Sequence, residues 1–191
     1  MGTLNKPPRA LLNALGGLQA RHEVEEPAMS KHLDEMLKRR SRMVQYSHQG
    51  RAYDWLFEAD YHHVDGETCD ECEKGRLVER PTRVDEREIV VHAGNIASGD
   101  EVMRDGKTRD RIAAAEKVIC FEMEAAGLMD TFPCLVIRGI CNYADSHENK
   151  GWQRYAAATA ASYAKELLLA MPATEVARTP LAEGAMTGMS S

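Results

Sequence analysis

The feature that most constrains the fold of this chain is the alternation of short apolar runs with helical segments between residues 88 and 171. Three runs have the β-branched and apolar character of buried strands, at residues 88–94, 118–121 and 134–140. Helical patterns occur at residues 108–117, 122–129 and 152–171. Strands of continuous apolar character that alternate with helices are typical of a sheet covered on both faces. We therefore predict an α/β fold.

Two helices are predicted ahead of this region and a disordered tail behind it. Apolar residues keep helical spacing at Leu11, Leu12, Leu15 and Leu18, and a second amphipathic helix is predicted over residues 27–40. Residues 44–87 are polar and show no sustained period, whereas residues 173–191 are small and polar. We expect one domain over residues 1–172, with a helical and loop insertion at about 20–87, followed by the tail at 173–191.

Composition narrows the classes of function. The chain has 191 residues, 43% of them hydrophobic, and a net charge of −6, which gives no concentrated basic surface for a nucleic acid. No run approaches the roughly 18 to 20 apolar residues that a membrane helix needs. Cys120, Cys134 and Cys141 lie in apolar runs, as free thiols do. These patterns favour a cytoplasmic protein without a nucleic-acid or membrane partner.

A group of histidines and cysteines lies in the polar middle of the chain. His62, His63, Cys69 and Cys72 are close enough in sequence to permit a four-ligand zinc site. A single CxxC motif with neighbouring histidines is equally typical of two free thiols in a long surface loop. We take the second interpretation and predict no resident metal, with a small zinc-stabilised interaction domain as a minor alternative.

Polar residues follow the predicted strands where a ligand site would form. In α/β sheets the loops after the carboxyl ends of the strands hold the ligand. Glu122 and Glu124 follow one strand, and an extended backbone would point both carboxylates to the same side. Carboxylates can accept hydrogen bonds from a sugar diol. The competing explanation is that acidic residues stabilise a helix N-terminus, and Asn142 and Asp145 could likewise satisfy loop backbone groups.

Three segments resemble a known enzyme superfamily. They read IASGDEVM at 96–103, FEMEAAG at 121–127 and VIRGICNYAD at 136–145. In this order they are similar to the signature of the nucleoside phosphorylase and nucleosidase superfamily, which includes purine nucleoside phosphorylase, uridine phosphorylase and methylthioadenosine/adenosylhomocysteine nucleosidase. The middle of the chain resembles the fungal version of that domain. The resemblance implies a phosphorylase-type mixed sheet flanked by helices, incomplete at its N-terminus, and a homo-oligomer.

The same resemblance assigns roles to individual residues. Glu124 would bind the ribose hydroxyls, Met123 would pack beneath the sugar, and Glu122 would position the nucleophile. Asn142 would engage the purine at the position where adenine-directed members have an aspartate that protonates the leaving base. The base pocket and the turn beside it would be formed by Val102, Met103, Ser98 and Gly99. No cofactor is implied, although phosphate is a possible co-substrate.

The implied function is cleavage of the N-glycosidic bond of purine nucleosides or nucleotides, by phosphorolysis or hydrolysis. The alternative is a catalytically inactive, nucleoside-binding module with a regulatory role, or a truncated remnant of the enzyme. Two features favour the alternative. Asn142 carries an amide, which cannot deliver a proton to the departing purine, and the phosphate-binding front half of the family is not found in the chain.

Overall fold

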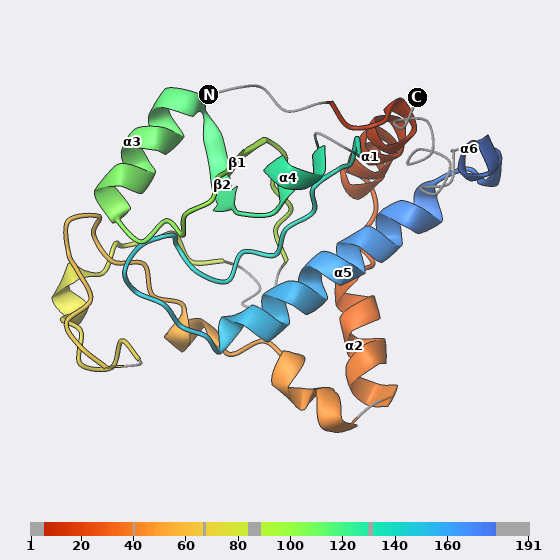
Figure 1. Cartoon of the computed structure of the whole chain (residues 1–191). Coiled ribbons are helices and arrows are strands. Elements are labelled where there is room, and N and C mark those ends of the chain that lie inside the picture. Colours follow the sequence, from red (N-terminus) through yellow and green to blue (C-terminus); the bar gives the residue numbers. More distant parts are fainter. Residues whose placement is uncertain (1–5, 40, 67, 84–88, 130–131, 179–191) are drawn as a thin grey trace.

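The computed structural model describes residues 6–39, 41–66, 68–83, 89–129 and 132–178 (Figure 1). Three of its helices, α1 (Arg9–His22), α2 (Met29–Arg39) and α5 (Trp152–Ala170), pack together. All three are close to the helices predicted from the sequence. Their apolar faces meet in a cluster that we term the helical core, made of Ala14, Leu18, Met29, Tyr163 and Leu167.

A buried carboxylate joins the three helices of this core. Glu166 of α5 is 8% exposed, and its Oε1 atom lies 3.0 Å from Nε2 of His22 at the end of α1. The same oxygen accepts a hydrogen bond from the backbone N–H of Ala28, just before α2, at 3.1 Å. A buried charge needs such partners, so Glu166 fixes the connection between α1 and α2 against α5.

The described part of the sheet consists of two parallel strands, β1 (Asn95–Ser98) and β2 (Val118–Glu122), which pair from Asn95 with Val118 to Ser98 with Glu122. Parallel strands need a crossover connection, and α3 (Gly106–Glu116) supplies it. The short helix α4 (Ala125–Met129) follows β2 directly. The predicted α/β character is therefore present, but the described sheet has only two strands.

Two predicted strands are wrong. Residues 89–94 and 134–140 are irregular, and the strand expected at 88–94 begins only at Asn95; residue 88 lies outside the described residues. Ile89, Leu135 and Ile137 still pack against the helical core. The runs as a whole are not buried as predicted, because Val90, Val91 and Ile140 are 42%, 39% and 51% exposed. A strand also needs a neighbour with which to pair. No phosphorylase-type mixed sheet is seen in the described part of the chain.

The middle of the chain forms a second, smaller cluster. Three 3₁₀ turns, η1 (Ser41–Tyr46), η2 (Arg51–Tyr53) and η3 (Lys74–Arg76), punctuate an otherwise irregular path. Phe57, which is fully buried, packs with Cys69 and Cys72 and forms an isolated bridge with Leu77. We term this group the Phe57 cluster. It gives a segment without regular structure a core of its own.

The C-terminal part of the chain differs from its prediction at one place. Helix α6 (Ala173–Arg178) stands where the disordered tail was expected to begin, and residues 179–191 lie outside the described part. Within the described residues, none of the helices is both long and apolar enough to span a membrane.

Candidate functional site

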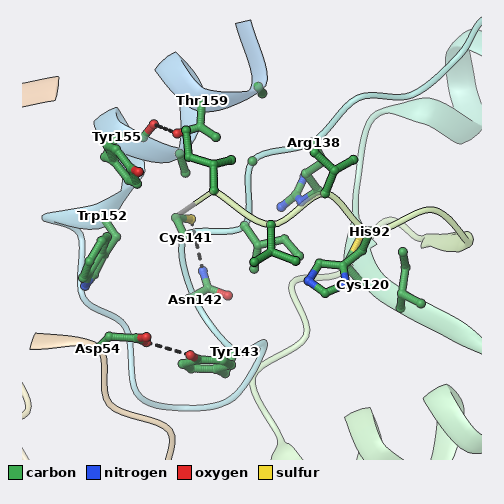
Figure 2. A pocket seen from close by; sticks show the side chains of 18 of the residues that line it. Asp54, His92, Cys120, Arg138, Cys141, Asn142, Tyr143, Trp152, Tyr155 and Thr159 are labelled. Atoms are coloured by element: carbon green, nitrogen blue, oxygen red, sulfur yellow. Dashed lines mark hydrogen bonds between the residues drawn. The ribbon is translucent and has the colours of Figure 1, made fainter. Parts of the chain in front are cut away.

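A cavity of about 750 Å³ lies between α5, residues 135–143, residues 89–94 and the segment from His48 to Trp55 (Figure 2). This volume is within the usual range of small-molecule pockets. Ile119 and Cys120 of β2 form part of its floor. The cavity therefore lies where the irregular apolar runs, the sheet and the longest helix meet.

One end of the cavity is aromatic. Trp152 and Tyr155 project from the first turns of α5, with their ring centres 5.9 Å apart. His48 meets both rings edge to face, at 5.0 Å and 5.1 Å. The indole N–H of Trp152 donates to the backbone carbonyl of Tyr53 at 3.0 Å. These contacts hold flat apolar surfaces in place, and such surfaces can stack with a planar ligand.

A polar and internally paired group lies next to the aromatic residues (Figure 2). The hydroxyl of Tyr143 donates to Oδ1 of Asp54 at 2.6 Å, and Arg80 bonds to the hydroxyl of Tyr143 and to the side chain and backbone carbonyl of Asp54. Burial, followed by the hydrogen bond to Asp54, raises the pKa of Tyr143 to about 12. Tyr143 is therefore a neutral hydrogen-bond donor at ordinary pH.

Arg138 and Asn142 also line the cavity; Asn142 lies near Tyr143, and Arg138 lies on the opposite side from Trp152 and Tyr155, close to His92 (Figure 2). Arg138 lies 3.8 Å from Oε2 of Glu124, a long ion pair that leaves the guanidinium partly available to a ligand. Asn142 is used in its own loop, because its Oδ1 accepts the backbone N–H of Ala144 at 3.0 Å. The loop needs this bond since Ala144 has a left-handed backbone, with φ of 53°.

Glu122 does not face the cavity. Its side chain turns back on the start of α4, where Oε2 accepts the backbone N–H groups of Glu124 and Ala125, each at 2.8 Å. Burial alone would raise the pKa of Glu122, but hydrogen bonds from Ser98 and from these two N–H groups lower it overall. The structure thus gives Glu122 the helix-capping role that the sequence left open as the competing explanation.

The other residues predicted at this site are dispersed around the end of β2. Ser98 accepts the backbone N–H of Ala126 at 2.9 Å, and the N–H of Gly99 donates to the carbonyl of Glu122 at 3.1 Å. Met123 is 44% exposed and Val102 is 51% exposed. Of the predicted substrate-binding and catalytic residues, Asn142 lines the cavity; those that do not are Ser98, Gly99, Val102, Met103, Glu122, Met123 and Glu124.

The sequence analysis missed most of the cavity wall. Trp152 and Tyr155 lie in the helix predicted over residues 152–171, which was assigned no site, and Asp54 and Arg80 lie in a stretch without any periodic pattern. The aromatic character of the start of α5 is the one signal in the sequence that could have indicated a binding surface.

The histidine and cysteine group is partly assembled. Ligand atoms of His63, Cys69 and Cys72 all lie within 4.8 Å of one another, so these residues could hold a metal ion. His62 does not belong to this group. The ring of His147, from the loop after Asn142, lies beside it instead, 5.7 Å from the ring centre of His63.

Comparison with known proteins connects the chain to a larger protein. It is 42% identical over 174 residues to a nucleotide-binding leucine-rich repeat (NLR)-like protein of Hyaloscypha variabilis (strain UAMH 11265 / GT02V1 / F). The match covers 87% of this chain and 16% of that protein, so the chain spans about one sixth of the length of its relative. No protein-family profile matches the chain, and no solved structure matches it.

This relationship corrects the resemblance drawn from the sequence. The identification with the nucleoside phosphorylase and nucleosidase superfamily rested on three short segments, whereas the similarity to the NLR-like protein extends over 174 residues and points to a different family. The predicted cleavage of an N-glycosidic bond is wrong for the same reason, as is the description of the chain as a glycosyltransferase or nucleosidase. The alternative of a regulatory module agrees better with the relative.

Proposed function

We propose that the chain is a non-catalytic regulatory module of an NLR-like protein, and that it binds a nucleoside or nucleotide in the cavity beside α5. The observation that carries the regulatory part is the 42% identity with the NLR-like protein over most of the chain. The cavity supports the ligand part, because its volume of about 750 Å³ is of the right order for a ligand of this size.

The chemistry of the cavity wall suits this class of ligand. Trp152 and Tyr155 offer faces on which a base can stack. Arg138 offers a guanidinium, which suits the carbonyl groups of a base or a phosphate. The carboxyl group of Asp54 is bonded to Arg80 and Tyr143, so it supports the wall instead of acting on the ligand. We therefore propose that the cavity binds its ligand without catalysing a reaction.

Two further properties belong to this proposal. A cytoplasmic location is supported by Cys69, Cys72, Cys120, Cys134 and Cys141, all of which are free thiols. Assembly with a second copy of the chain is an expectation that light scattering can test. Neither a cofactor nor a nucleic-acid or membrane partner is part of the proposal.

The test measures binding and turnover together. The full chain is titrated calorimetrically with adenosine, inosine, guanosine, uridine and ATP, and each mixture is then analysed by chromatography for free base. We expect saturable binding of at least one compound and no released base. Release of base would contradict the proposal that the module is non-catalytic. Absence of binding by a folded sample would contradict the proposal that the cavity binds a nucleoside or nucleotide.

A matched pair of variants locates the binding. Arg138→Gln removes the guanidinium from the cavity, whereas Arg111→Gln removes an exposed guanidinium from α3 that does not line it. We expect at least a tenfold weaker affinity for the first variant, which corresponds to about 1.4 kcal/mol, and unchanged affinity for the second. Equal effects in both variants would show that general charge, and not the cavity, governs binding.

A further inference from the structure

The cluster of His63, Cys69 and Cys72 has the donor set of a structural zinc site. Cys69 and Cys72 are 5% and 4% exposed, and neither forms a disulfide. With His63 they bring two sulfur atoms and one imidazole nitrogen within 4.8 Å of one another. Zinc sites closed by four protein ligands use cysteine and histidine, often with two residues between a pair of cysteines. The cluster lacks only a fourth ligand.

His147 is the candidate for the fourth ligand: it lies outside the group whose ligand atoms are within 4.8 Å of one another, but its ring is next to that of His63. Its side chain is 2% exposed, and neither ring nitrogen has a hydrogen-bond partner in the described part of the chain. Buried polar groups without partners are rare and call for an explanation. The ring centre of His147 lies 5.7 Å from that of His63. Two imidazoles on one zinc would place their ring centres roughly 5 Å apart, given zinc–nitrogen distances of about 2.1 Å and tetrahedral angles.

A polar backbone or side-chain oxygen lies beside one nitrogen of each imidazole. Nε2 of His63 lies 3.0 Å from the backbone carbonyl of Thr68, which leaves Nδ1 for a metal. Nδ1 of His147 lies 3.6 Å from Oδ1 of Asp145, which leaves Nε2. Histidines that bind metals almost always donate their second nitrogen to a carbonyl or a carboxylate. His63 therefore has the supporting group that a metal ligand needs, and Asp145 lies next to His147 at a distance longer than a hydrogen bond.

The two cysteines lie in a tight turn of the backbone. The backbone N–H of Cys72 donates to the carbonyl of Cys69 at 3.2 Å, and Nζ of Lys74 donates to the same carbonyl at 2.6 Å. Phe57 stacks on the ring of His147 with centres 4.2 Å apart and closes the other side of the cluster. Zinc sites in which four protein ligands leave no open position have a structural role. Cys69 and His147 also line the cavity beside α5.

We propose that His63, Cys69, Cys72 and His147 bind one zinc ion, which ties the irregular segment around the Phe57 cluster to the loop at residues 142–149. This loop begins with Asn142 and Tyr143, which line the cavity, so the metal would brace one wall of the cavity. The site does not depend on the function proposed above. It also replaces His62, the histidine considered from sequence, with a residue 75 or more positions further along the chain than either cysteine.

The test is the metal content and cobalt spectrum of the full chain. The untagged protein is purified with its thiols reduced and dialysed extensively, and zinc is measured by mass spectrometry of the element. We expect one zinc per chain. Replacement by Co²⁺ should give the visible bands of a tetrahedral site and the charge-transfer band of cobalt bound by thiolate. Zinc content far below one per chain, with no such band on addition of Co²⁺, would overturn the proposal.

Single substitutions assign the ligands. Cys69→Ser and His147→Gln should each weaken zinc affinity by at least 100-fold, and Asp145→Asn by about 10- to 100-fold, since it supports a ligand. Cys134→Ser, which removes a thiol outside the cluster, should bind zinc as the unaltered chain does. Circular dichroism shows whether a variant has unfolded. If it has, the cobalt spectrum of the unaltered chain alone tests whether the zinc site exists. Zinc retained in His147→Gln with an unchanged cobalt spectrum would contradict the assignment of His147.

Discussion

The helical core and the Phe57 cluster bury their side chains by different means. In the helical core, Leu18 and Leu167 are 0% and 2% exposed because they recur on one face of long helices. In the Phe57 cluster, residues 57, 69 and 72 are brought together by an irregular chain with one isolated bridge. Regular periodicity builds the first, and individual side-chain contacts build the second.

The contacts of the Phe57 cluster reach far along the sequence. Phe57 and Tyr61 stack on His147 at ring-centre distances of 4.2 Å and 5.4 Å, and Lys74 lies over the ring of Trp55 at 3.4 Å. Because the described residues of this region form only short 3₁₀ turns and one isolated bridge, the loss of one ring should weaken more of its contacts than the loss of one side chain weakens in a helix. The predictions below test this difference.

The largest effect is expected from Phe57→Ala. The substitution leaves a cavity where a fully buried ring contacted Tyr61, His147 and the two cysteines. The free energy of unfolding should fall by about 3–5 kcal/mol in urea titrations. Val64→Ala in the same segment is the control, because Val64 is 63% exposed and should change stability by less than about 0.5 kcal/mol. Equal losses would show that the segment contributes no core.

A slightly smaller loss is expected from Leu18→Ala in the helical core. Leu18 is 0% exposed, so truncation should cost about 2–5 kcal/mol. Leu12→Ala makes the same change on the same helix at a side chain that is 41% exposed, and its cost should be clearly smaller. Hydrogen exchange should show the loss concentrated in α1, α2 and α5. Loss of protection throughout residues 54–80 would instead join the two regions into one cooperative unit.

Glycine substitutions should act with opposite signs in the two regions. A Cβ atom at Gly106, the first residue of α3, would lie 2.7 Å from the carbonyl oxygen of Ala59, close to the Phe57 cluster. A Cβ at Gly17 in α1 meets nothing within 4 Å. We therefore expect Gly106→Ala to destabilise by about 1–3 kcal/mol and Gly17→Ala to stabilise by about 0.5–1 kcal/mol. Thermal unfolding of both variants checks this, and stabilisation by both would contradict the close packing of α3.

The sequence predicted the helices well and the sheet poorly. The periodic pattern that gives Leu11, Leu15 and Leu18 one face is a local property, so α1, α2 and α5 were placed correctly. Strand formation depends on a partner elsewhere in the chain, and residues 134–140 have none in the described structure. The motif resemblance then suggested a wider sheet, which the described residues do not show, and cleavage of an N-glycosidic bond, which the relationship to the NLR-like protein contradicts.

The candidate site was predictable only in part. Asn142 was recognised and does line the cavity, but the aromatic wall and the pair of Asp54 and Tyr143 depend on contacts between distant segments. The same reason explains the histidine and cysteine cluster. Nearness in sequence pointed to His62, whereas the fold places the ring of His147 5.7 Å from that of His63.

The smallest effect concerns the start of α3, where Asp105 caps the helix beside the Phe57 cluster. Its Oδ1 accepts the backbone N–H of Thr108 at 2.7 Å, and hydrogen bonds from the side chain and backbone of Thr108 lower the pKa of Asp105 below its ordinary value of 3.8. A lowered pKa stabilises the folded state above pH 3.8, and this stabilisation is lost as the pH falls through the lowered value.

Asp105→Ala should therefore reduce the hydrogen-exchange protection of α3 near neutral pH and have progressively less effect in acid. Asp105→Asn keeps an oxygen that can cap but does not titrate, so its protection should be independent of pH in this range. An Asp105→Ala effect that is constant with pH would mean that the carboxylate charge does not contribute to the cap.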